Sequence, residues 1–136
     1  MSPDARFFCG LTLILVPTII YGGLTVLGVV SGGRYGAPAP PDLTPMQVTF
    51  YRAGHAHAGV LVLLALFLQI ALDHASLPFS LVRPLRVAAV AGPLLVSGGF
   101  FGLAHLPPLR VLLYLGAAVL AATTVTVGVG LIRGRG

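Results

Sequence analysis

Apolar residues fill four long stretches of this chain, and polar side chains interrupt each stretch only rarely. The stretches run from about residue 7 to 30, 53 to 72, 87 to 106 and 111 to 132. A helix needs roughly 20 residues to cross a hydrocarbon core of about 30 Å, so each stretch is long enough to span a membrane. In lipid the backbone polar groups must be satisfied within the segment, which favours helices. The pattern predicts an all-α, four-transmembrane-helix bundle, formed as one integral membrane domain by residues 1–136.

The connections between the stretches indicate where the helices begin and end. In "TPMQ", Thr44 is a good N-cap and Pro45 suits a first helical position, so the second helix should begin well before its apolar part. The tight connection "LPPLR" makes the third and fourth helices antiparallel neighbours. The helices are therefore predicted at about 7–30, 45–73, 86–106 and 110–132, with both termini on one side.

Composition supports the bilayer as the solvent of this chain. Hydrophobic residues make up 57% of it and charged residues 8%, against about 25% charged residues in a soluble domain. The arginines stand singly at the ends of apolar stretches, so nucleic acid is not an expected partner. The positive-inside rule favours cytoplasmic termini, because the termini side would carry the larger group of arginines. These are Arg6, Arg83, Arg86, Arg133 and Arg135, against Arg34, Arg52 and Arg110. The membrane itself is expected to be a bacterial inner (plasma) membrane.

Three histidines are predicted at one depth, near the outer ends of the second and third helices. His55 and His57 come soon after the start of the second helix, and His105 lies at the end of the third. These helices run antiparallel, so the three side chains reach a similar level, with Arg52 about one turn further out. Ionisable groups within a membrane are costly and are functional candidates by default.

The polar residues of the second helix form one broad stripe. At about 100° per residue, His55, Gln69 and Asp73 fall on the side that we expect to face the bundle interior. His57 falls on roughly the opposite side, where it would meet a neighbouring helix, a second subunit or lipid headgroups. Asp73, together with His74, is also expected to cap the cytoplasmic end of this helix.

A haem b held between His55 and His105 is the first candidate ligand of this region. The two imidazoles would be axial ligands from two helices. Gly98 and Gly102 would leave room for the flat ring, and Arg52 would pair with a propionate. The alternative is that these glycines form a small-xxx-small surface that only packs helices together.

A transition metal held by His55, His57 and His105 is the second candidate. No Asp or Glu lies at that depth within the spans to orient the imidazoles. Tyr51, or Asp42 of the first connection, would have to do so.

The segment "GHAHAGVLVLLAL" resembles the histidine-bearing helix of haem-copper oxidase subunit I and of NnrS-like membrane proteins, over about residues 52–66. In those proteins a His-x-His element heads an apolar helix, so the resemblance implies that His55 and His57 are metal-site positions. "YRAGHAH" is also similar, at Arg52 and Ala53, to the second helix of MAPEG-type four-helix glutathione enzymes. The matching acidic residue is missing, since the chain has no Glu.

These observations predict a small polytopic membrane protein that binds haem or a transition metal. It would serve electron transfer, metal handling or the assembly of a larger respiratory or photosynthetic complex. Two alternatives remain open: a cofactor-free structural or interaction subunit, and a small enzyme or transporter that uses His55 and Arg52 on an anionic substrate. Glycine-rich faces and His57 leave surface for a partner besides lipid, so we expect a homo-oligomer or a larger membrane complex.

Overall fold

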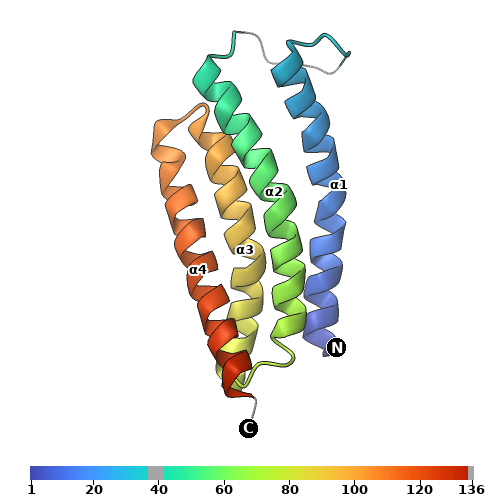
Figure 1. Cartoon of the computed structure of the whole chain (residues 1–136), viewed down its shortest axis with the longest axis vertical. Helices are drawn as coiled ribbons and strands as arrows, with labels where there is room; N and C mark the ends of the chain where they lie inside the picture. The colour runs from blue at the N-terminus through green and yellow to red at the C-terminus, as the bar shows by residue number, and fades with distance from the viewer. Residues whose placement is uncertain (37–41, 135–136) are drawn as a thin grey trace.

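The computed structural model describes residues 1–36 and 42–134, and within them the chain is an antiparallel bundle of long helices (Figure 1). The elements are α1 (Pro3–Ser31), α2 (Pro45–Ala71), α3 (Phe79–Leu103), a short 3₁₀ turn η1 (Pro107–Leu109) and α4 (Arg110–Arg133). Over these residues, 4 helices are long and apolar enough to cross a membrane, which confirms the predicted helical bundle.

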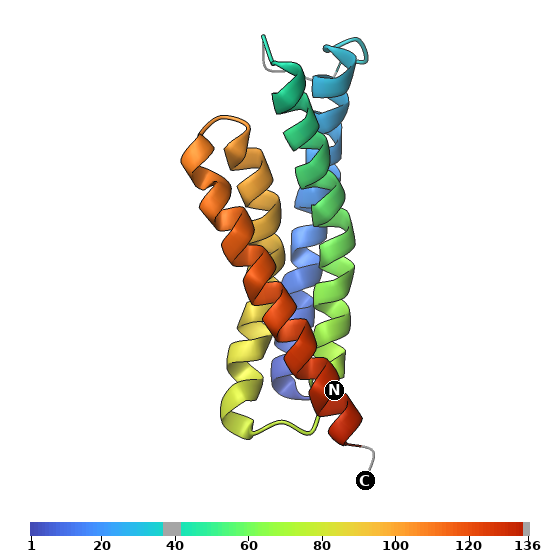
Figure 2. The ribbon, with the colours of Figure 1, turned by 60° about the vertical axis from the view of Figure 1, so that its left-hand side comes forward.

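The two ends of the bundle differ in what they hold. The start of α1 and the end of α4 lie together at one end, here called the termini end (Figure 1). The opposite end, here called the histidine end, holds the first turns of α2 and the last turn of α3. At the histidine end α1 and α2 extend beyond the turn that joins α3 to α4 (Figure 2).

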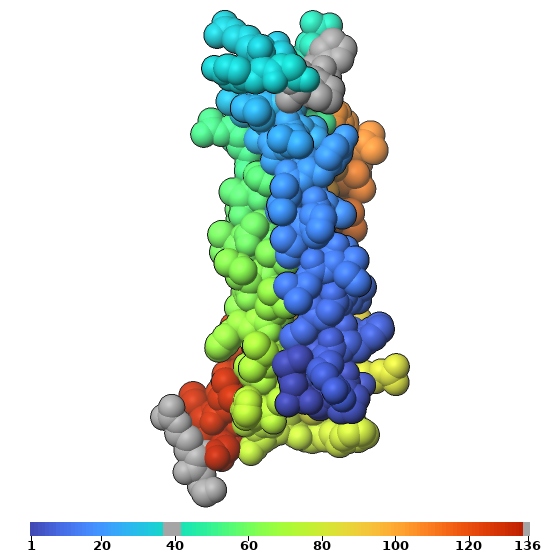
Figure 3. Space-filling model, turned by 90° about the vertical axis from the view of Figure 1, so that its right-hand side faces the viewer, coloured from blue at the N-terminus to red at the C-terminus, as the bar shows by residue number. Residues whose placement is uncertain are grey.

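Each helix packs mainly on its neighbours in sequence. α1 lies along one face with α2 beside it (Figure 3), and α3 and α4 form a hairpin that leans away from α2 at the histidine end (Figure 2). α1 meets α3, and α2 meets α4, over much less of their lengths. The main buried apolar cluster joins α2, α3 and α4 and consists of Leu68, Ala71, Leu72, Ala89, Leu120 and Val127.

Capping chemistry sets the starts of α1 and α2. The Thr44 hydroxyl accepts the Gln47 N–H at 3.3 Å, and Gln47 Oε1 accepts the Thr44 N–H at 2.8 Å. This capping box confirms Thr44 as the N-cap, with Pro45 following it. α1 begins at Pro3, earlier than the predicted residue 7, because the Ser2 hydroxyl accepts an N–H of its first turn.

The bounds of α3 depart most from the prediction. The helix begins at Phe79 rather than near residue 86, and it ends at Leu103 rather than 106. The prolines and serines of "SLPFSLVRP" predicted a connection, yet Pro84 lies inside the helix. Pro84 is the sixth residue of α3, so it removes the bond that an N–H there would make to the Ser80 carbonyl, and the helix continues through it. α2 likewise ends at Ala71 rather than at residue 73.

Glycines let the backbones of α3 and α4 approach each other closely. A Cβ at Gly99 would lie 2.5 Å from the backbone nitrogen of Leu113, and one at Gly116 would lie 2.7 Å from that of Val96. Small residues at such positions are typical of membrane helix pairs, because lipid supplies no hydrophobic drive between helices and close packing must replace it. The close approach of α3 and α4 thus occurs at Gly99 and Gly116, whereas the small-residue surface was predicted at Gly98 and Gly102.

We expect Gly99→Ala to destabilise the bundle by at least about 1–3 kcal/mol, the usual cost of overpacking a filled interface. Gly98→Ala is the matched control, since a Cβ there would meet no atom within 4 Å among the described residues. It should change the free energy of unfolding by less than about 0.5 kcal/mol. Thermal unfolding of both variants in one detergent checks this, and equal midpoints would contradict the close approach of α3 and α4.

Candidate functional site

The imidazole of His55 packs against α1. A Cβ at Gly23 would lie 3.2 Å from its Nε2 atom, and one at Gly22 would lie 3.8 Å from its Nδ1 atom. The side chain is half-buried, and the ring fits beside α1 because these two positions lack side chains. The polar stripe of the second helix was predicted to face the bundle interior, and the contact that the structure gives the His55 ring is with α1.

The imidazole of His57 is fixed by a hydrogen bond within its own helix. Its Nδ1 atom lies 2.7 Å from the carbonyl oxygen of Ala53. A carbonyl oxygen only accepts, so Nδ1 carries the proton, and in the neutral imidazole Nε2 holds the lone pair. The ring also lies over Phe100 of α3, with centroids 4.8 Å apart and planes inclined by 33°. His57 therefore meets a neighbouring helix, which was one of its three predicted surroundings.

His105 pairs with Tyr51. Its Nε2 atom lies 2.9 Å from the Tyr51 hydroxyl, and the two rings meet edge to face with centroids 5.8 Å apart. Tyr51 also meets Phe101 edge to face, so this contact ties the start of α2 to the end of α3. The contacts of His105 and His55 are thus with Tyr51 and with α1, and their pairing across a haem stays a prediction.

The other predicted residues of this end have separate surroundings. A Cβ at Gly102 would lie 2.6 Å from Cδ1 of Leu109, so the space expected for a ring beside Gly102 is filled by that side chain. Gly98 and Arg52 are exposed. Within residues 1–36 and 42–134 no group of three or more His, Cys, Asp or Glu side chains is placed to hold a metal ion. A metal bound by all three histidines stays a prediction.

An open groove runs where α2 and α4 stand apart over α3. It has a volume of about 510 Å³ and is lined almost entirely by apolar side chains of the three helices. His57 and Phe100 belong to the lining near the histidine end. A groove of this size falls in the usual range of ligand sites, about 300–1,000 Å³. Sequence reasoning could not find it, because it depends on how far α4 stands from α2.

Arg110 is exposed and is the first residue of α4, one turn before the first α4 residue that lines the groove. At about 100° per residue it falls within about 80° of every α4 residue of the lining. Those residues are Leu113, Ala117, Leu120, Ala121, Thr124 and Val125. The groove thus has apolar walls and an imidazole in its lining, and Arg110 lies on the same face of α4 outside that lining.

At the termini end, the buried guanidinium of Arg86 joins α3 to α2. Its side chain is 1% exposed. Its Nη1 donates to the backbone carbonyl of Gln69 at 2.8 Å and to the side-chain Oε1 at 3.2 Å, and Gln69 Nε2 donates to the Arg86 carbonyl at 2.9 Å. The Asp73 N–H, which would be the helical donor to the Gln69 carbonyl, donates to the Ile70 carbonyl. The Gln69 carbonyl, in the last turn of α2, accepts from Arg86 in its place.

The same guanidinium joins α1 to this contact through Asp73. Arg86 Nη2 pairs with the Asp73 carboxylate and donates to the Ser2 hydroxyl at 3.2 Å. Ser2 in turn donates to Asp73 from its backbone N–H at 2.6 Å and from its hydroxyl at 2.7 Å. The prediction that Asp73 and His74 cap α2 was therefore wrong for Asp73, whose carboxylate binds α1 and α3. His74 is exposed.

Sequence reasoning missed this cluster, which we call the Arg86 cluster (Ser2, Gln69, Asp73 and Arg86). It correctly put Gln69 and Asp73 on an interior stripe, and Gln69 is 0% exposed. Arg86 was predicted to be one of the arginines that flank an apolar stretch at the membrane surface. The signal that could have paired the charges is a lone Asp after one span and two arginines, Arg83 and Arg86, at the start of the next.

Comparison of the chain with protein-family models, with curated proteins and with solved structures finds no match. The resemblances of the His-x-His segment therefore rest on its own residues. Any function assigned to the chain has to be argued from its fold and from the contacts of its side chains.

We expect Arg86→Met to lower the free energy of unfolding by about 3 kcal/mol, because it leaves Asp73 and Gln69 without their partner. Arg83→Met is the matched control: Arg83 lies one turn earlier on α3 and is exposed. The double variant Arg86→Met with Asp73→Asn should lose less than the sum of the two single losses, because it removes both charges. Additive losses in chemical unfolding would show that the two side chains do not interact.

The stability of the bundle should fall in acid through Asp73. Burial raises the pKa of this carboxyl, but hydrogen bonds from Ser2 and the pairing with Arg86 outweigh burial, so its pKa is lowered. A lowered pKa stabilises the fold fully above the unfolded value of about 3.9, and the contribution is lost as the pH falls through the folded value. The stability gap between the parent and Asp73→Asn should thus stay constant from about pH 7 to 5 and shrink below about pH 4. Asp4→Asn, an exposed acid at the same end, should keep the parent's acid-dependent loss.

Proposed function

We propose that this chain is a small integral membrane protein that binds haem b in the groove between α2 and α4, with His57 as an axial ligand. The observation that carries the proposal is the Nδ1 bond of His57 to the Ala53 carbonyl at 2.7 Å. Ligating histidines characteristically donate their other ring N–H to a carbonyl or carboxylate, which fixes the tautomer and raises the basicity of the ligand nitrogen. His57 has this arrangement before any ligand is present.

The surroundings of His57 also suit a flat, apolar cofactor with acidic groups. The groove supplies apolar walls from three helices, and Phe100 offers an aromatic face beside the imidazole. Arg110, on the same face of α4 as the groove lining, would pair with a propionate. The cofactor class predicted from the sequence is kept in this proposal, while the ligand moves from His55 and His105 to His57.

A bound haem would make this chain an electron-transfer or accessory subunit of a larger membrane complex. We further propose that the termini face the cytoplasm of a bacterium, on the arginine counts of the two sides. A cofactor-free packing role is the second candidate, and the contacts of His55 with α1 and of His105 with Tyr51 favour it for those two residues.

Haem content decides between these candidates. Protein purified in mild detergent and supplied with haem should show a haem absorption spectrum, and His57→Ala should weaken haem binding at least about tenfold, since the ligand itself is lost. His55→Ala and His105→Ala are the matched controls and should keep haem. Loss of haem in these two variants alone would restore the site predicted from the sequence. Failure of the parent to bind haem would leave the packing role.

A further inference from the structure

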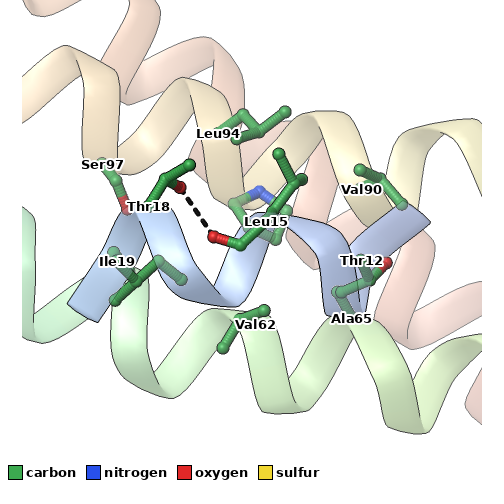
Figure 4. Close-up of a pocket in the computed structure, with 11 residues that line it drawn as sticks. Thr12, Leu15, Thr18, Ile19, Val62, Ala65, Val90, Leu94 and Ser97 are labelled. Atoms are coloured by element: carbon green, nitrogen blue, oxygen red, sulfur yellow. Dashed lines mark hydrogen bonds between the residues drawn. The ribbon is translucent and has the colours of Figure 1, made fainter. Parts of the chain in front are cut away.

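A small cavity lies between α1, α2 and α3, on the side of the bundle away from the groove (Figure 4). It encloses about 60 Å³, and its walls are mostly apolar, including Leu15 and Ile19 of α1, Val62 of α2 and Leu94 of α3. Leu94 is 54% exposed, so the cavity borders the surface where α1 and α3 stand apart. In a membrane that surface faces lipid.

One polar group in this cavity has unused hydrogen-bonding capacity. The Ser97 side chain lines the cavity, the residue is 8% exposed, and its hydroxyl has no hydrogen-bond partner among the described residues (Figure 4). Thr12 and Thr18, which line the same cavity, donate to carbonyls of their own helix at 2.7 and 2.6 Å. Serine and threonine within helices usually make this local bond. Ser97 therefore holds the free O–H donor of the cavity.

Depth limits which molecule can meet this donor. Ser97 lies six residues, about 9 Å, inside the end of α3, and the cavity reaches Val90 about 10 Å deeper. The ester groups of phospholipids stay near the interface, and a charged group is costly at this depth. Water needs two to four polar partners, and walls that are almost wholly apolar supply them poorly. The class of molecule left to accept the hydrogen bond of Ser97 is therefore neutral and soluble in lipid.

We propose that this cavity is a binding site for a neutral, lipid-soluble carbonyl compound of the ketone or quinone class, whose oxygen accepts the hydrogen bond of Ser97. A cavity of about 60 Å³ takes only the carbonyl end of such a molecule, and its apolar chain would extend past the exposed Leu94 onto the lipid-facing surface. The bound oxygen satisfies a buried hydroxyl that is otherwise costly to leave unpaired. The site is separate from the His57 groove and does not depend on haem.

The probe for a test is the ketone 2-undecanone, compared with the alkane undecane, which has the same carbon chain and no oxygen. Thermal unfolding of the full chain in detergent is followed as each compound is titrated, and the shift of the midpoint gives an apparent affinity. We expect the ketone to raise the midpoint of the parent, and the alkane to raise it clearly less.

Ser97→Ala should weaken the apparent affinity for the ketone about fivefold, the usual worth of one hydrogen bond, and should leave the alkane unchanged. Ser80→Ala, an exposed serine on the same helix, is the matched control and should behave as the parent. Equal shifts for ketone and alkane in the parent would overturn the proposal, and this comparison requires no variant. Equal ketone affinity in the parent and Ser97→Ala, or an ordered water on the Ser97 hydroxyl at saturating ketone, would overturn it as well.

Discussion

A buried cation at the termini end is the constraint on which the arrangement of three helices depends. A guanidinium removed from water costs several kcal/mol unless its donors are paired. Arg86 finds its partners on α2, in Gln69 and Asp73, and at the start of α1, in Ser2. Its Nε, which is also buried, has no hydrogen-bond partner among the described residues. Sliding one of these helices along another would separate Arg86 from its partners, which lie at or near helix ends.

α4 is held by different means. It carries no member of the Arg86 cluster and is fixed to α3 by backbone approach at Gly99 and Gly116. The connection after α2 adds one bond, from the Ser76 N–H to the Gly130 carbonyl at 2.9 Å. Neither the Arg86 cluster nor the contacts of α4 with α3 join α4 to α2, or α1 to α3, along their lengths. The groove and the cavity lie at these two weakly packed junctions.

Local features of the chain could be predicted from the sequence, and features that depend on helix rotation could not. Four apolar stretches and the Thr44 cap are local, so both predictions hold. The partner of His55 depends on the rotation of α1 about its axis. Gly22 and Gly23 leave room for the ring beside α1, but the sequence does not indicate which side chain fills that room. The space beside Gly102 depends on the turn that carries Leu109 across it. The start of α3 was obscured by Pro84, which usually marks a helix boundary but here lies inside the helix.

The polar atoms of the two ends indicate where chemistry can occur. At the termini end the Ser2 hydroxyl already makes the three hydrogen bonds that a hydroxyl can make, donating to Asp73 and accepting from Ala5 and Arg86. A group saturated in this way stabilises the fold and has nothing left for a ligand. At the histidine end the Ala53 carbonyl lies inside α2, where the helix already supplies it with a backbone donor. Its additional bond from Nδ1–H of His57 selects the tautomer in which Nε2 of the neutral ring is the acceptor. Binding of a ligand at Nε2 thus requires no change of tautomer.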